Sequence, residues 1–179
     1  MMPRDLLQTL APKQLLQLTG EVIDELRSRG IARTGNNPLA DYTEWLVATS
    51  FGWQLADTSV QGYDATDRRT NIRYEIKGRR VTPRNKSRQL SAIRDIDGDN
   101  FDFLIAVIYD QAFNIVRALR IPRSIAQSAG KHSKHTNSLI LHARDALLQR
   151  DGVKDITKRL SEEANKIAER VQRATSRKS

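Results

Sequence analysis

Apolar and charged residues alternate along residues 72–79, and this period of two predicts a half-buried β-strand. The alternation places Glu75 and Lys77 on the same face of the strand, one pleat apart. A polar turn precedes the strand, so residues 60–65 are expected to fold back as the other arm of a hairpin. That hairpin brings Asp64 close to Glu75.

Helical spacing of apolar residues predicts three longer helices. The first covers residues 12–29 and ends at Gly30, and the second covers residues 39–50, after an Asn-Asn-Pro start signal. The third begins after Gly152 and has a narrow apolar stripe among charged residues. It is expected to pack on the core or to pair with a second copy.

Between the second and third helices the pattern alternates between strands and short helices. Residues 101–109 are nearly all apolar and short in extent, which is typical of a buried central strand. Residues 84–93 are predicted to form a helix with Leu90 and Ile93 facing inward. Further elements are predicted after the central strand: a strand at 113–121, a short helix at 122–129, a basic loop at 130–137, a strand at 138–142 and a helical turn at 145–148.

This order of elements predicts an α/β protein with a mixed central β-sheet flanked by helices. We expect a helical segment at residues 1–34, a core at 35–150 and a C-terminal amphipathic helix at 151–179.

The composition fits a globular protein: 39% of the 179 residues are hydrophobic, and there is no cysteine. The lack of cysteine excludes disulfides and thiolate metal sites, and it is compatible with a reducing cytoplasm. No apolar run approaches the roughly 20 residues that span a bilayer. The first ten residues lack the uninterrupted apolar region of a signal peptide. We therefore expect a cytoplasmic protein without membrane contact.

The net charge of +9 is concentrated around the hairpin. Residues 65–94 contain ten Lys or Arg and two Asp or Glu, which gives +8 for this segment. Such a basic region is the electrostatic signature of a phosphate-backbone partner, although a solvated basic surface is the plainer interpretation. Because this basic segment adjoins a pair of carboxylates, nucleic acid is the favoured partner.

Asp64 and Glu75 offer the hard oxygen ligands that Mg²⁺ prefers, and a neighbouring lysine can orient or deprotonate a metal-bound water. Asp67 is the less favoured carboxylate, since it is expected to be exposed in the turn. The acidic segment at residues 95–100 has the wrong spacing for a calcium loop and is interpreted as a turn.

The sequence Asp64, then Glu75-Ile76-Lys77, resembles the PD-(D/E)xK nuclease superfamily, also called restriction-endonuclease-like. Tyr63 stands where the motif has proline. The resemblance covers roughly residues 35–120 and includes a helix with Glu44 before the motif and Gln89 after it. It implies a restriction-endonuclease-like core with helical additions at both ends.

The resemblance also implies roles for particular residues. Asp64, Glu75 and the Ile76 carbonyl would bind Mg²⁺, with Mn²⁺ as an alternative ion, and Lys77 would be the catalytic lysine. Glu44 and Gln89 would line the active site. The basic residues that would hold the DNA backbone are Arg79, Arg80, Arg84, Lys86, Arg88, Lys131 and Lys134.

The leading hypothesis is therefore a magnesium-dependent nuclease that hydrolyses DNA phosphodiester bonds, acting on double-stranded DNA as a homodimer by analogy with the family. The rival hypothesis is a non-catalytic nucleic-acid-binding or assembly protein, in which Glu75 and Lys77 form only an ion pair. The geometry separates the two: carboxylates of Asp64 and Glu75 that converge beside Lys77 favour the enzyme, and diverging side chains favour the binder.

Overall fold

The computed structural model describes residues 4–35, 37–57, 62–96, 98–133, 135 and 137–176. The chain divides into two compact units, Met1–Tyr42 and Thr43–Ser179. The first unit contains the short helix α1 (Arg4–Gln8), the helix α2 (Pro12–Ser28) and the start of α3 (Leu39–Phe51). No residue of α2 is buried.

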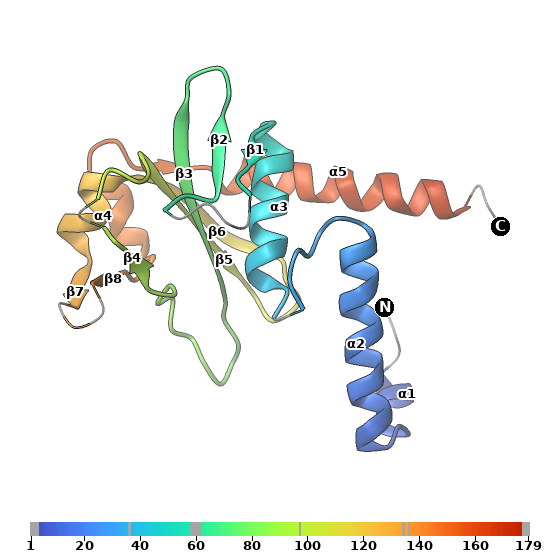
Figure 1. Ribbon diagram of the computed structural model, residues 1–179. Coiled ribbons are helices and arrows are strands. Elements are labelled where there is room, and N and C mark those ends of the chain that lie inside the picture. Colours follow the sequence, from blue (N-terminus) through green and yellow to red (C-terminus); the bar gives the residue numbers. More distant parts are fainter. Residues whose placement is uncertain are drawn as a thin grey trace. The chain divides into compact units, whose positions relative to one another are not determined.

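The second unit is built on a mixed six-stranded sheet, in which the strand order is β1-β2-β3-β5-β6-β9 (Figure 1). Only the central pair, β3 and β5, is parallel, and the other neighbours are antiparallel. The strands of this sheet are β1 (Gln54–Leu55), β2 (Ala65–Asp67), β3 (Ile72–Arg80), β5 (Phe103–Tyr109), β6 (Ile115–Pro122) and β9 (Lys154–Asp155).

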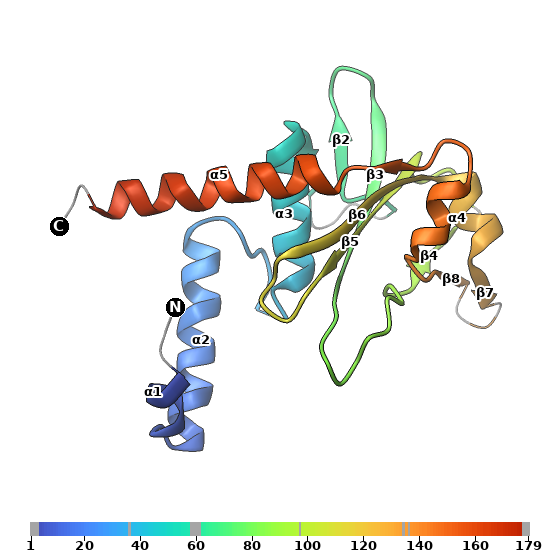
Figure 2. The same cartoon turned by 180° about the vertical axis from the view of Figure 1, so that it is seen from behind.

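A smaller three-stranded sheet, ordered β4-β8-β7, completes the core together with the helix α4 and the 3₁₀ helix η2. Figures 1 and 2 show α3 and α4 on opposite sides of strands β3, β5 and β6. The long helix α5 (Thr157–Ser176) begins beside β6, where Thr157 Oγ1 accepts a hydrogen bond from the Ala118 N–H at 2.9 Å. The remaining elements are β4 (Ile93–Arg94), α4 (Arg123–Ala129), β7 (Lys131–Ser133), β8 (Ser138–Ile140) and the 3₁₀ helix η2 (Asp145–Gln149).

One face of β3 packs against α3, and the close approach requires a glycine. A Cβ atom on Gly78 would clash with Oγ1 of Thr43 and lie 3.1 Å from its Cβ. Thr43 is fully buried and contacts the hydroxyl of Tyr109 at 3.3 Å. Trp53 stacks on Tyr74 of the same face, with ring centroids 3.6 Å apart. These contacts fix α3 against the strand that carries the motif.

The opposite face of the sheet holds the larger hydrophobic cluster. There Leu104, Ala106 and Ile108 of β5 are fully buried beneath α4, the small sheet and the segment between β3 and β4. Leu104 and Ala106 are paired in register with Glu75 and Lys77. The polar residues of the motif therefore lie beside the core and not on an open surface.

Most of the elements predicted from the sequence are confirmed, including the helices at 12–29, 39–50 and 122–129 and the buried strand at 101–109. The sheet is mixed and flanked by helices, as expected. The second arm of the predicted hairpin is β3, but the first arm predicted at 60–65 is wrong: β2 is Ala65–Asp67, and among the described residues 62–65 only Ala65 belongs to it.

Three further expectations are wrong. Residues 84–93 form a tight turn and extended chain instead of a helix, because Pro83 begins a turn closed by Thr82 and Asn85. Leu90 and Ile93 are nevertheless buried. Asp67 was expected to be exposed in the turn, but it is the last residue of β2 and only 8% exposed, and its carboxylate accepts the backbone N–H of Arg69. The basic loop at 130–137 begins with a strand, β7.

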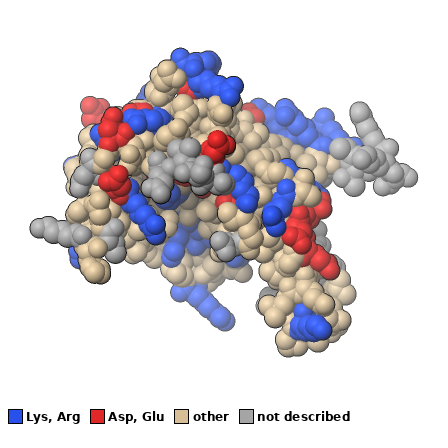
Figure 3. Space-filling view, viewed as in Figure 1, with Lys and Arg blue, Asp and Glu red and all other residues tan. Residues whose placement is uncertain are grey.

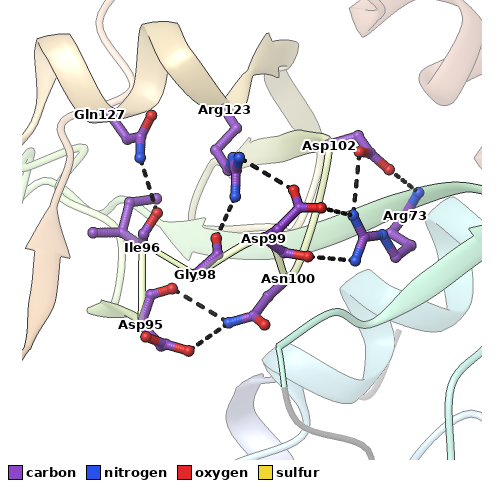
Figure 4. Close-up of polar contacts among 9 residues, drawn as sticks. All are labelled: Arg73, Asp95, Ile96, Gly98, Asp99, Asn100, Asp102, Arg123 and Gln127. Atoms are coloured by element: carbon purple, nitrogen blue, oxygen red, sulfur yellow. Dashed lines mark hydrogen bonds and ion pairs between the residues drawn. The ribbon is translucent and has the colours of Figure 1, made fainter.

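An ion-pair cluster holds the acidic turn before β5 in place (Figure 4). The Asp102 carboxylate accepts the backbone N–H of Arg73 at 2.7 Å and also pairs with the Arg73 guanidinium. Asp99 forms ion pairs with both Arg73 and Arg123. The turn thus connects the starts of β3, β5 and α4.

Within the described residues, no helix is both long enough and apolar enough to cross a membrane.

Candidate metal and active site

Asp64 lies at the point where β2 separates from β3. Its backbone N–H donates to the Tyr74 carbonyl at 2.8 Å, and its carboxylate accepts the Ile76 N–H at 2.7 Å. The carboxylate thus takes the place of a neighbouring strand at Ile76. Because Asp64 is bonded on both sides of Glu75, the two acidic residues are held next to each other.

Lys77 connects the predicted site residues. Its Nζ forms an ion pair with Oε1 of Glu75 and lies 3.5 Å from Oδ2 of Asp64. The same nitrogen donates to the Ile76 carbonyl at 3.3 Å. Three oxygens, one each from Asp64, Glu75 and Ile76, therefore converge on a single point.

The cluster is largely shielded from water. The side chains of Asp64, Glu75 and Lys77 are 21%, 12% and 17% exposed. Burial raises the pKa of Glu75, and the charge of Asp64 raises it further, against the opposing effect of Lys77. Burial alone would lower the pKa of Lys77, but the surrounding carboxylates outweigh it, and the pKa of Lys77 is raised.

Glu44 belongs to the same electrostatic group. It lies on α3, is 8% exposed, and is among the negative charges that raise the pKa of Lys77. Three carboxylates and one ammonium give the group a formal charge of −2. A buried excess of negative charge favours the binding of a further cation.

The donor atoms fit a hard divalent cation. Two carboxylates and a backbone carbonyl are oxygen ligands, and Mg²⁺ commonly uses one or two carboxylates and keeps several waters. The described residues contain no group of three or more His, Cys, Asp or Glu side chains arranged around one metal position. A cation at this point would therefore have the Ile76 carbonyl as its third protein ligand.

A glycine and the acidic turn support the position of Asp64. Gly62 has φ +102°, and a Cβ atom there would lie 2.6 Å from Cβ of Asn100. Only a glycine allows the chain to pass so close to Asn100, which belongs to the turn anchored by Arg73 and Arg123. The Gln-Gly-Tyr-Asp stretch before the motif is visible in the sequence. No local pattern, however, indicates that Gly62 lies against Asn100.

Gln89 is not brought to this cluster by any contact between described residues. It is exposed, and its backbone bridges to His142 instead. Residue 89 lies in extended chain, and the helix predicted at 84–93 does not form. A place for Gln89 in the site stays a prediction.

The basic residues predicted to hold DNA fall into two groups. Arg79, Arg80 and Arg88 also bind within the protein, to the Ser87 carbonyl, the Gln111 carbonyl and Asp145, respectively. The second group is exposed and consists of Arg84, Lys86 and Lys131. Lys134 lies outside the described residues.

Two further cations, Arg68 and Arg69, lie at the tip of the β2–β3 hairpin and were not predicted as DNA contacts from the sequence. Both are exposed, and Figure 3 shows basic side chains gathered at this tip, at the top of the view. Arg68 is held by the side chain of Gln54, and Arg69 by Asp67. The signal for them was the local charge excess around the motif.

Comparisons of the chain with protein-family models and with curated proteins found no significant match.

Proposed function

We propose that the protein is a magnesium-dependent nuclease that hydrolyses DNA phosphodiester bonds, with a restriction-endonuclease-like core. One observation carries the proposal: oxygens of Asp64, Glu75 and Ile76 surround a single nitrogen, Nζ of Lys77. The strand separation at Ile76 and the buried Glu44 support it.

In this proposal Asp64, Glu75 and the Ile76 carbonyl hold Mg²⁺, or Mn²⁺ in its place. The bound ion supplies polarisation of a phosphate oxygen and a water with a lowered pKa. The raised pKa of Lys77 keeps its ammonium protonated. In this proposal the ammonium donates a hydrogen bond to the scissile phosphate and stabilises the negative charge that develops there. Glu44 restrains Lys77 electrostatically from the side of α3.

The basic surface near the motif is proposed to bind the DNA backbone. Arg84 and Lys86 are exposed on the segment after β3, and Arg68 and Arg69 are exposed on the hairpin tip. They flank the strand that carries Glu75 and Lys77. Exposed Lys and Arg side chains on both sides of a recessed site can grip the phosphates that flank a cleavage position.

The rival proposal, a non-catalytic nucleic-acid-binding or assembly protein, also has an observation in its favour. Lys77 already forms ion pairs with both carboxylates, as a purely structural cluster would. On that view the site needs no metal. The convergence of the carboxylates, which a simple Glu75–Lys77 pair does not require, favours the enzyme.

The test is incubation of the purified protein with supercoiled plasmid DNA and Mg²⁺ or Mn²⁺, with EDTA as the control. The proposal expects nicked or linear product with either ion and none with EDTA. Asp64→Asn and Glu75→Gln keep side-chain size and should abolish cleavage. Arg170→Ala, on the exposed surface of α5, should leave it intact. Cleavage that survives both carboxylate changes would sink the proposal.

Pairing of two copies through α2 is proposed for the first unit. α2 has no buried residue and exposes Leu15, Leu16 and Val22. An amphipathic helix whose apolar side chains stay partly exposed is commonly an association surface. Light scattering should give twice the chain mass for the wild type and the single mass for Leu16→Glu/Val22→Glu; an unchanged mass would place any pairing elsewhere.

A further inference from the structure

A second site lies apart from the carboxylate cluster, over the small sheet. It is a pocket of about 450 Å³ between the end of α4, strands β7 and β8, and η2. Its volume is in the range of pockets that bind small ligands. Ile140 and Leu147 supply apolar lining.

The polar lining of this pocket is entirely basic. Lys131, His142, Arg144 and Arg150 line it, and none of its lining residues is acidic. Asp145 follows Arg144 in the chain, but its carboxylate is bonded to Arg88 and Arg117. Lys131, Arg144 and Arg150 are exposed cations around one hollow, and an anion among them would relieve their mutual repulsion.

The positions of the cations are defined by the fold. Lys131 pairs in register with Ile140, and the backbone at His142 bridges to Gln89. The Arg150 guanidinium donates to Oγ of Ser128 at 3.2 Å, which fixes one side of the pocket. Arginine guanidinium groups suit phosphate oxygens because they can donate two parallel hydrogen bonds.

We infer that this pocket binds the phosphate group of a phosphate ester, with Arg144 and Arg150 as the main donors and Lys131 adding charge. The apolar lining accepts the group attached to the phosphate. The ester is either a backbone phosphate of nucleic acid or a free mononucleotide. This site is separate from the proposed nuclease site, and only the choice of a backbone phosphate as its ligand rests on the proposed DNA binding.

The pocket is connected to the motif strand through one segment of chain. The Arg79 side chain donates to the Ser87 carbonyl, and two residues later Gln89 bridges to His142. Nucleic acid that follows this segment would reach the pocket. This connection makes the backbone phosphate the source that we expect.

The test measures binding of three probes in the presence of EDTA, so that cleavage plays no part: inorganic phosphate, deoxyadenosine 5′-monophosphate and a short DNA duplex. Arg144→Ala/Arg150→Ala removes the two main donors. Lys158→Ala/Arg170→Ala removes two exposed charges on α5 and is the matched control. Calorimetry serves the small probes, and fluorescence anisotropy serves the duplex.

We expect the pocket variant to bind the duplex at least about tenfold more weakly than the control variant, because each charge-assisted hydrogen bond contributes about a factor of ten. A loss for the mononucleotide without a loss for the duplex would identify a free ester as the ligand. If no probe is bound more weakly by the pocket variant than by the control, the inference is wrong. Lys131→Ala/Arg144→Ala, which leaves the Arg150–Ser128 bond intact, gives the same test should the first variant not fold.

Discussion

Replacing Gly78 by alanine tests how α3 is packed against the motif strand. The added Cβ would overlap Oγ1 of Thr43 and lie 3.1 and 3.3 Å from that residue's Cβ and Cγ2. Thr43 is fully buried, so it cannot move aside without shifting α3. Glu44 is the next residue and would move with it.

Overpacking of a core typically costs about 1–3 kcal/mol, and disturbing the Thr43–Tyr109 hydrogen bond adds about 1 kcal/mol. An alanine is intrinsically better than a glycine in a strand by about 0.5–1 kcal/mol. We therefore expect Gly78→Ala to lower the free energy of unfolding by about 1–3 kcal/mol. The assay is urea denaturation followed by tryptophan fluorescence, since Trp53 stacks on this face.

The matched control is Thr43→Ala/Gly78→Ala, in which the overlapping hydroxyl is gone. This double variant should be more stable than Gly78→Ala alone, with a coupling energy of about 1 kcal/mol or more. Gly20→Ala adds the same methyl group where nothing lies within 4 Å, and it should not destabilise the protein. If Gly78→Ala matches the wild type and shows no coupling to Thr43, the packing described is wrong.

Three further predictions concern charge. Arg84→Ala/Lys86→Ala should reduce the salt dependence of DNA binding by up to about two slope units in anisotropy titrations; an unchanged slope would place the DNA elsewhere. Hydrogen bonds from Thr157 and the charge of Arg117 outweigh burial and lower the pKa of Asp155, so its stabilising effect should be complete well above its ordinary pKa of 3.8 and vanish as the pH falls below the lowered value. Urea unfolding of Asp155→Asn should thus show a loss of about 0.5 kcal/mol at pH 7 and none in strong acid, whereas a constant loss would contradict the assignment. Asp102→Ala should destabilise the fold by about 1–3 kcal/mol, because it leaves a backbone N–H of β3 without its acceptor, while Asp99→Ala should have a smaller effect; equal losses would refute this.

The local patterns of the sequence predicted most of the architecture. The alternation in β3 and the apolar run of β5 follow directly from burial on one or both faces. They also placed Glu75 and Lys77 together, and Lys77 Nζ is in contact with Glu75. Residues two apart in a strand lie on the same face, so the periodicity of the sequence is enough to predict that they are neighbours.

Elements that depend on tertiary contacts were not predictable in this way. β9 is two residues long and exists only because it pairs with β6. The segment 84–93 has helix-compatible composition, but its backbone groups instead bond to the chain just after β8, as in the Leu90–Leu141 hydrogen bond. Tertiary pairing therefore outweighed local propensity.

The candidate site shows the same limit. Asp64 and Glu75 could be joined through a hairpin, but the capture of the Ile76 N–H by Asp64 requires the two strands to separate at that residue. The approach of Asn100 to Gly62 joins segments far apart in sequence. The basic pocket around Arg144 likewise combines α4, β7, β8 and η2, which no local pattern links.

We propose that Asp64, Glu75 and the Ile76 carbonyl form a metal site whose central position is taken by the ammonium of Lys77. Calorimetric titration of Mg²⁺ or Mn²⁺ into the wild type, Asp64→Asn and Lys77→Met tests it most directly. The account predicts binding by the wild type, loss in Asp64→Asn, and equal or tighter binding in Lys77→Met, although that variant should not cleave plasmid DNA. Binding that ignores Asp64, or no binding at all, would contradict the account and leave the cluster as an ion pair alone.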